Sequence, residues 1–206
     1  MKYHYKITGV TELMFYLNYQ YLSFIPKINS FYPSGNKTKP VMIKMENVLD
    51  AQYQFLDIKL GCPTSSPYYK SQQQIEKNRF KCLQTIQAQQ FFRIVNYSYQ
   101  HIIIGKYDSR YLSYEQTLSL INLFISNKHI LGTIINLQNM LLKINKINGY
   151  FFGSSILFYT IQDHIYVKLI DFQQFTPMKQ IINPNVQIGI YNIIQILKQF
   201  SHCCLD

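Results

Sequence analysis

An aspartate and a lysine stand two positions apart near the end of an apolar run, in the segment 55–61, which reads Phe-Leu-Asp-Ile-Lys-Leu-Gly. Side chains of a β-strand alternate between its two faces, so Asp57 and Lys59 would emerge on one face while leucine and isoleucine cover the other. Gly61 allows a sharp turn or the close approach of a ligand. Taken alone, the pair fits either a surface ion pair or a charged site on a rigid element.

A second acid, Asp171, also follows an apolar run, and Phe172 comes directly after it. A carboxylate at a strand end is a suitable metal ligand, because the strand fixes it while the neighbouring ring packs beneath. Phosphoryl transfer needs cations on the nucleotide phosphates and a carboxylate for Mg²⁺, which Lys6, Lys59 and Asp171 could supply. The sequence contains no Walker-type glycine loop and no Gly-x-Gly-x-x-Gly, so the common nucleotide cradles are absent.

The elements that must position these residues follow from the spacing of apolar side chains. Ser66 and Ser113 are predicted to cap helices, and residues 29–40 have the composition of a loop. The irregular alternation of strands and helices favours an α+β fold over a doubly wound parallel sheet. We expect strands at 2–7, 41–45, 55–60, 91–97, 99–104, 155–161 and 165–170, and helices at 12–24, 66–89, 113–126, 131–145 and 188–200.

Length and composition indicate a folded, soluble, intracellular protein. The 206 residues, 48% of them hydrophobic, suffice to bury a core, and no stretch reaches the ~20 apolar residues of a membrane span. Four cysteines without zinc-like spacing favour free thiols, and the scattered histidines predict no metal site. A formal charge of +10 favours an anionic partner. Nucleic acid is disfavoured, because the aromatic residues fall mostly at core spacing.

In their order along the chain, the motifs resemble those of the inositol polyphosphate kinase family. Residues 57–61 match its Asp-x-Lys-x-Gly, residues 154–157 (Ser-Ser-Ile-Leu) resemble its Ser-Ser-Leu-Leu, and residues 170–172 match its Ile-Asp-Phe. Shorter similarities extend over nearly the whole chain, and several are closest to the inositol hexakisphosphate kinase branch. These lie at residues 6–16, 24–27, 45–48, 81–82 with Arg93, 106–110 and 189–193.

The resemblance implies an α+β fold of two lobes, distantly related to protein kinases, with ATP in the cleft between them. Residues 1–206 would form one domain, with an N-lobe at 1–46, a hinge at 47–50 and a C-lobe at 51–206. It implies transfer of the γ-phosphate of ATP, with Mg²⁺, to a soluble inositol polyphosphate, either inositol hexakisphosphate or a lower inositol phosphate. We expect a monomer in the cytoplasm, the nucleus or both, without nucleic acid or a membrane span.

The same resemblance implies how the nucleotide is held. Lys6 would contact the nucleotide phosphates, and the backbones of Glu46 and Val48 would hydrogen-bond adenine. Asp171 would ligate Mg²⁺, and Ser155 would support the phosphate and metal end of the site.

The acceptor side is implied in the same way. Asp57 would hold the ribose or the acceptor hydroxyl, and Lys59 would meet the transferred phosphate as the main catalytic residue. In the helix after Gly61, Gln74 stands where relatives carry a lysine, which leaves Lys70 or Lys77 to bind the substrate. That substitution also motivates the alternative function, a catalytically weak module of the same fold that binds inositol phosphates or phosphoinositides.

Overall fold

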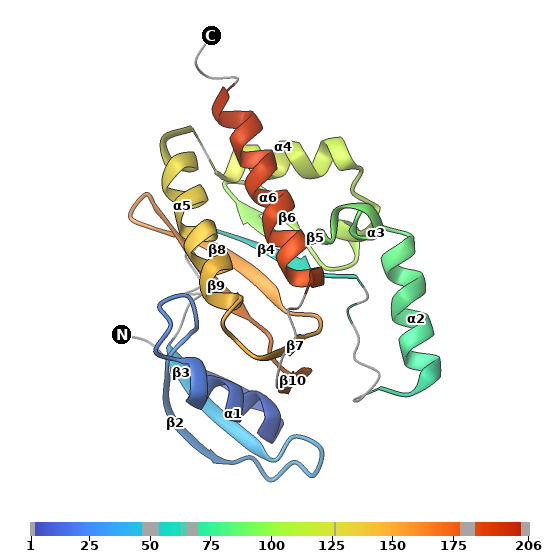
Figure 1. The fold of residues 1–206 in the computed structure, drawn as a ribbon, viewed down its shortest axis with the longest axis vertical. Helices are drawn as coiled ribbons and strands as arrows, with labels where there is room; N and C mark the ends of the chain where they lie inside the picture. The colour runs from blue at the N-terminus through green and yellow to red at the C-terminus, as the bar shows by residue number, and fades with distance from the viewer. Residues whose placement is uncertain are drawn as a thin grey trace.

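The computed structural model describes residues 3–46, 54–62, 64, 70–125, 127–177 and 184–202. Two antiparallel sheets dominate the described part of the chain (Figure 1). The smaller sheet and α1 lie at the bottom of the view, and the larger sheet lies above them with its helices. The fold is therefore α+β, as the alternation of elements predicted.

The smaller sheet has three strands in the order β1-β3-β2, so β3 is central. Residues 29–40, predicted as a loop, contribute β2, and the first helix ends at Tyr19 rather than at residue 24. Pairing explains the error, because β2 is a largely exposed edge strand that pairs with β3 despite its polar composition. The elements are β1 (Tyr3–Thr8), α1 (Val10–Tyr19), β2 (Ile28–Pro33) and β3 (Val41–Glu46).

The larger sheet has five strands in the order β6-β5-β4-β8-β9, which places β4 in its centre. Along β4, Leu56, Ile58 and Leu60 are 0% exposed, while Asp57 and Lys59 alternate with them on the other face. The two-faced strand predicted at residues 55–60 is confirmed. The strands are β4 (Phe55–Leu60), β5 (Phe92–Tyr99), β6 (Ile102–Ile104), β8 (Ser155–Ile161) and β9 (His164–Ile170).

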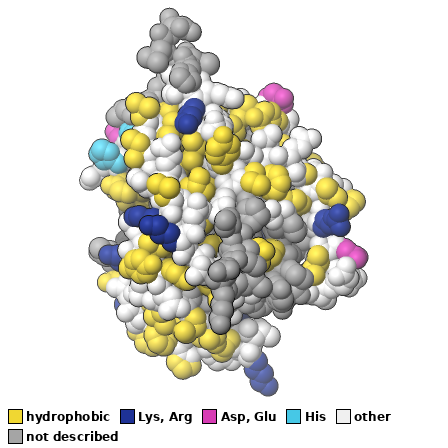
Figure 2. Space-filling model, in the orientation of Figure 1, with side chains coloured by type: hydrophobic (Ala, Val, Ile, Leu, Met, Phe, Trp, Pro, Cys, Tyr) yellow, Lys and Arg dark blue, Asp and Glu magenta, His cyan; other side chains and the backbone are white. Residues whose placement is uncertain are grey.

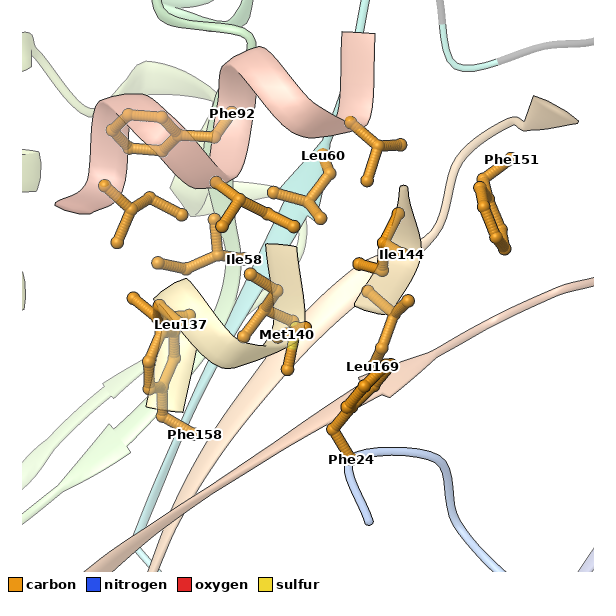
Figure 3. Packing of buried hydrophobic residues seen from close by; sticks show 14 of the residues in the cluster. Phe24, Ile58, Leu60, Phe92, Leu137, Met140, Ile144, Phe151, Phe158 and Leu169 are labelled. Carbon is orange, nitrogen blue, oxygen red and sulfur yellow. The ribbon is translucent and has the colours of Figure 1, made fainter. Parts of the chain in front are cut away.

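Three helices provide the apolar side chains that bury the leucine face of β4. Figure 3 shows Leu137, Met140 and Ile144 of α5 packed near Ile58 and Leu60. Ser113 forms the predicted capping box before α4, with its hydroxyl oxygen accepting from the Gln116 N–H at 3.2 Å. The helices are α4 (Tyr114–Phe124), α5 (Asn127–Ile144) and α6 (Pro184–His202).

The helix predicted over residues 66–89 is two helices. The first begins after Ser71, whose hydroxyl oxygen accepts from the Gln74 N–H at 3.4 Å, whereas Ser66 lies outside the described residues. The second ends at Phe91, which adopts a left-handed conformation with φ 57°. The remaining elements are α2 (Gln72–Leu83), α3 (Gln87–Gln90), the 3-10 helix η1 (Asp108–Tyr111), and the short paired strands β7 (Gly149–Phe151) and β10 (Phe175–Pro177).

One continuous hydrophobic core connects α1 with the larger sheet and its helices. Phe15 of α1 stacks on Phe172 with 3.8 Å between ring centroids. In the described part of the chain, no single helix is long and apolar enough to cross a membrane. One pair, Tyr114–Phe124 with His129–Ile144, passes that test together by length and composition alone, with a bend of 106° between its helices.

Candidate active site

The ammonium group of Lys6 on β1 contacts two carboxylates that are far apart in the sequence. Its Nζ lies 2.9 Å from Glu12 Oε1 and 2.9 Å from Asp171 Oδ1. Glu12 is 0% exposed, and its Oε1 also accepts from the Phe172 N–H at 2.9 Å. The Thr8 hydroxyl donates to the same carboxylate. Because the buried Glu12 is fully engaged, it fixes Lys6 and the 171–172 backbone relative to each other.

Asp171 comes directly after the last residue of β9 and has φ 65°. Aspartate tolerates this left-handed conformation better than most residues. The Ser154 hydroxyl donates to its backbone carbonyl at 3.1 Å. The Asp171 carboxylate reaches Lys6 through Oδ1 and lies 3.8 Å from Lys59 Nζ through Oδ2. The Phe172 ring is buried, as the sequence predicted, so Asp171 projects from a well-fixed segment.

Lys59 passes close to the backbone of the segment that precedes β8. A Cβ added to Gly153 would lie 3.4 Å from Lys59 Cε, 3.6 Å from its Nζ and 2.8 Å from the Thr64 carbonyl oxygen. Gly153 also has φ 68°, which disfavours a side chain there. Any other residue at 153 would therefore displace Lys59 or the chain at Thr64. Ser155, a predicted site residue, lies opposite Lys59 in the β4–β8 register.

Asp57 lies two positions from Lys59 on the same face of β4, but it is engaged differently. The Asn96 side-chain amide donates to Asp57 Oδ2 at 3.4 Å. Its Oδ1 is buried and accepts no hydrogen bond of normal geometry among the described residues, although the Ser155 hydroxyl is close enough to act against the rise in the Asp57 pKa. A buried carboxylate oxygen without a donor is costly unless a ligand completes it.

The surroundings shift the pKa values of these four charged groups in different directions. Burial raises the pKa of Asp57, with Lys59 acting in the opposite direction. Burial would also raise the pKa of Asp171, but Lys6 and Lys59 outweigh it and hold that pKa below its usual value. The pKa of Lys59 is lowered by burial despite both aspartates. Burial opposes ionisation of Lys6, but Glu12 and Asp171 raise its pKa overall.

Substitution of Asp57 by asparagine is expected to stabilise the protein at neutral pH. When the pKa of a carboxyl group is raised by folding, the folded protein loses stability as the pH rises through the unfolded pKa, near 4. An asparagine amide does not ionise and so avoids this loss. We expect Asp57→Asn to raise the melting temperature at pH 7 by about 2–4 °C and to leave it unchanged below about pH 3.5. Thermal unfolding at both pH values measures this, and a lower melting temperature at pH 7 would contradict the assigned environment.

Two residues of β5 that composition did not single out face the charged cluster. Register pairs Asp57 with Asn96 and Lys59 with Arg93, and a bulge shifts the register between them. Residues three apart would point to opposite faces of a regular strand, so the bulge is what brings Arg93 and Asn96 to one face. The family resemblance drew attention to Arg93. The pairing of Arg93 with Lys59, and of Asn96 with Asp57, was not predictable from spacing.

A basic cavity of about 630 Å³ lies between α2 and η1. Its lining includes the predicted Lys77 together with Lys81 and Arg110, and Arg110 Nε is buried without a hydrogen-bond partner among the described residues. Burial lowers the pKa of Lys81, and so does the charge of Arg110 and Lys77. Lys70, just before α2, is not among the described lining residues. Another cavity, of about 650 Å³ beside β9 and α5, has none of the predicted site residues among its described lining.

The predicted adenine-binding segment is described only in part. Val48 lies outside the described residues. The Glu46 N–H donates to the Lys27 carbonyl at 2.9 Å, and its carboxylate pairs with Lys168 at 2.7 Å. A carbonyl oxygen has two lone pairs, so the Glu46 carbonyl is the group suited to receive a hydrogen bond from adenine.

The carboxylates of Asp57 and Asp171 suit a hard divalent cation whose remaining ligands come from a bound phosphate and water. Asp171 raises the pKa of Asp57 after the larger effect of burial, so the two acids lie within electrostatic reach of each other. No group of three or more His, Cys, Asp or Glu side chains among the described residues is arranged to hold a metal. Mg²⁺ characteristically takes one or two protein carboxylates and completes its shell with water and phosphate oxygens.

Comparisons with known proteins identify the family and the fold. The model of the inositol polyphosphate kinase family matches residues 42–198. The inositol phosphate multikinase Ipk2 of S. cerevisiae, solved with ADP and Mn²⁺, is 18% identical, with a TM-score of 0.80 over 96% of this chain and 98% of that one. A second structure of an inositol phosphate multikinase is 19% identical, with a TM-score of 0.76 over 92% of this chain and 99% of that one.

No curated protein sequence matches the chain. The family match nevertheless covers well over half of the 206 residues, and the structural matches show that the fold is the one the motifs implied. The chain therefore belongs to the inositol polyphosphate kinase family.

Proposed function

We propose that this protein transfers the γ-phosphate of ATP, with Mg²⁺, to a soluble inositol polyphosphate. The observation that carries the proposal is the convergence of two lysines on the Asp171 carboxylate, with Lys6 Nζ at 2.9 Å and Lys59 Nζ at 3.8 Å. Asp57 lies on the same face of β4 as Lys59. The nucleotide would supply the phosphoryl group, and the metal would neutralise charge on its oxygens. The proposal is further supported by family membership and by ADP and Mn²⁺ in the yeast Ipk2 structure.

On the nucleotide side, the Glu46 carbonyl would accept from adenine, with Val48 as its predicted companion. Lys6, held by Glu12, would place its ammonium against the phosphates. Asp57 precedes Lys59 on β4 and so lies nearer the predicted hinge. We therefore assign Asp57 to the ribose hydroxyls rather than to the acceptor, and its Oδ1, which accepts no hydrogen bond of normal geometry among the described residues, is the atom available for them.

At the transfer step, Asp171 would hold Mg²⁺ through its carboxylate, which its lowered pKa keeps ionised at neutral pH. Lys59 would meet the transferred group, because its ammonium lies beside Asp171 and at the acceptor-side end of β4. Fixed positive charge aimed at developing negative charge is a large source of catalysis when water is excluded. Ser154 and the predicted Ser155 would keep this end of the site rigid.

The acceptor would extend from Lys59 towards the basic cavity between α2 and η1. Lys77, Lys81 and Arg110 there are cations without a balancing acid among the lining residues described. A net charge of +10 suits a polyanion. On the face shown in Figure 2, lysine and arginine side chains lie apart from one another among apolar ones, so no broad positive surface is seen there. The three cations that line one cavity favour a compact polyphosphate.

The test is ATP-dependent phosphorylation with a panel of acceptors from inositol trisphosphate to inositol hexakisphosphate, at fixed Mg²⁺. We expect a phosphorylated product from at least one acceptor and loss of product when the metal is chelated. Thermal stabilisation by an inositol phosphate, with no product from any acceptor, would instead support the catalytically weak binding module.

A further inference from the structure

Gln87 is a buried polar side chain whose amide nitrogen and amide oxygen both form hydrogen bonds near Lys59. It is 1% exposed, and its amide nitrogen donates to the Gly61 carbonyl at 2.6 Å. Its amide oxygen accepts from Arg93 Nε at 2.9 Å. The Gly61 N–H donates in turn to the Phe91 carbonyl at 2.7 Å. The short α3 segment therefore holds both polar backbone groups of Gly61, two residues beyond Lys59.

This contact holds Arg93 through a neutral partner, and burial lowers the Arg93 pKa more than the more distant Asp57 raises it. It lies directly opposite Lys59 in the β4–β5 register, so two cations share one face at neighbouring positions. Like charges at such positions destabilise a sheet unless something compensates them. Arg93 Nη1 is buried and has no hydrogen-bond partner among the described residues. A phosphate oxygen would satisfy both the free donor and the excess charge.

We infer that Gln87 is a positioning residue for the acceptor. By binding Nε, Gln87 fixes the plane of the Arg93 guanidinium and directs Nη1 to a phosphate of the inositol polyphosphate beside Lys59. Because Gln87 also holds Gly61, the same side chain sets the spacing between the two cations. This inference rests on the proposed function, but it concerns binding of the acceptor and can be tested without turnover.

The test replaces Gln87 by methionine, which keeps the length of the side chain and removes both hydrogen bonds. Affinity for inositol hexakisphosphate, measured by calorimetry without ATP, should fall about tenfold, since an Arg–phosphate contact loses its geometry. The acceptor KM should rise by a similar factor, while kcat and the KM for ATP stay within about twofold. Gln89→Met, on the exposed side of the same short helix, is the matched control and should change none of these.

A double-mutant cycle separates positioning from general loss of structure. In an Arg93→Gln background, Gln87→Met should lower the affinity by less than about twofold, because its effect acts through Arg93. A full tenfold loss in that background would overturn the inference. Should Gln87→Met not fold, Gln87→Glu keeps an acceptor for Arg93 Nε while offsetting its charge. Unchanged affinity in that variant would also overturn the inference.

The two proposals fail in different ways. A wild-type protein that binds inositol hexakisphosphate but phosphorylates no acceptor contradicts the proposed function. An active wild type with an unaffected Gln87→Met variant contradicts only the role of Gln87.

Discussion

Replacing Asp171 by asparagine is expected to lower kcat about a thousandfold, the scale set by losing a charge that stabilises the transition state. Asparagine adopts the left-handed conformation seen at φ 65°, so the backbone should be preserved while the metal-binding charge is lost. Steady-state phosphorylation of the best acceptor measures the effect. Asp163→Asn is the matched control, because Asp163 is an exposed aspartate with φ 62° in the turn between β8 and β9. Comparable activity in both variants would remove Asp171 from the metal site.

The same variant has a signature in stability. A carboxylate with a lowered folded pKa contributes stability above its unfolded pKa and loses it as the pH falls through the folded value. We therefore expect Asp171→Asn to be less stable than wild type at neutral pH, with the difference in unfolding free energy shrinking below about pH 4. A difference that grew towards acid pH would contradict the lowered pKa.

Replacing Lys59 by methionine is expected to lower kcat by about two to three orders of magnitude, in the range found for removing one oriented charge from a transition state. Methionine keeps the unbranched stem that passes Gly153, so the packing should survive. Since burial lowers the pKa of Lys59, a neutral side chain there should not reduce the melting temperature. Kinetics and thermal unfolding on the same sample test both statements.

Lys44→Met is the control for charge alone. Lys44 lies on β3 with its ammonium 4.2 Å from the centroid of the Tyr3 ring, away from the cluster, and its loss should leave kcat within about twofold. Equal losses in the Lys59 and Lys44 variants would mean that net charge, rather than the position of Lys59, supports the reaction.

The central strand and its two faces were predictable because the period of a half-buried strand is visible in six residues. The face assigned to Asp57 and Lys59 follows from alternation alone. The chemistry of phosphoryl transfer suggested Lys6 and Asp171 as further parts of the site, and the family resemblance gave them roles. Their contact could not be predicted locally, since nothing local connects residues 165 positions apart. The structure also shows Glu12 paired with Lys6, a contact for which the first helix gives no local signal.

Other features depend on tertiary contacts and could not be predicted locally. The bulge in β5 reverses the face expected for Asn96 relative to Arg93, and no spacing rule signals it. The break between α2 and α3 serves the burial of Gln87, which in sequence is one of many glutamines. Strand β2 forms because β3 offers it a partner, although its own residues read as a loop.

The link from Lys6 to Asp171 also bears on the order of folding. Closing a loop of that length costs conformational entropy before any contact repays it, so local helices and hairpins should form earlier. Glu12, which bonds Lys6 and the Phe172 N–H together, can complete its contacts only when the first and last thirds of the chain have met. The site is therefore assembled at a late stage, and a nascent chain acquires it only after residues 171 and 172 have been synthesised.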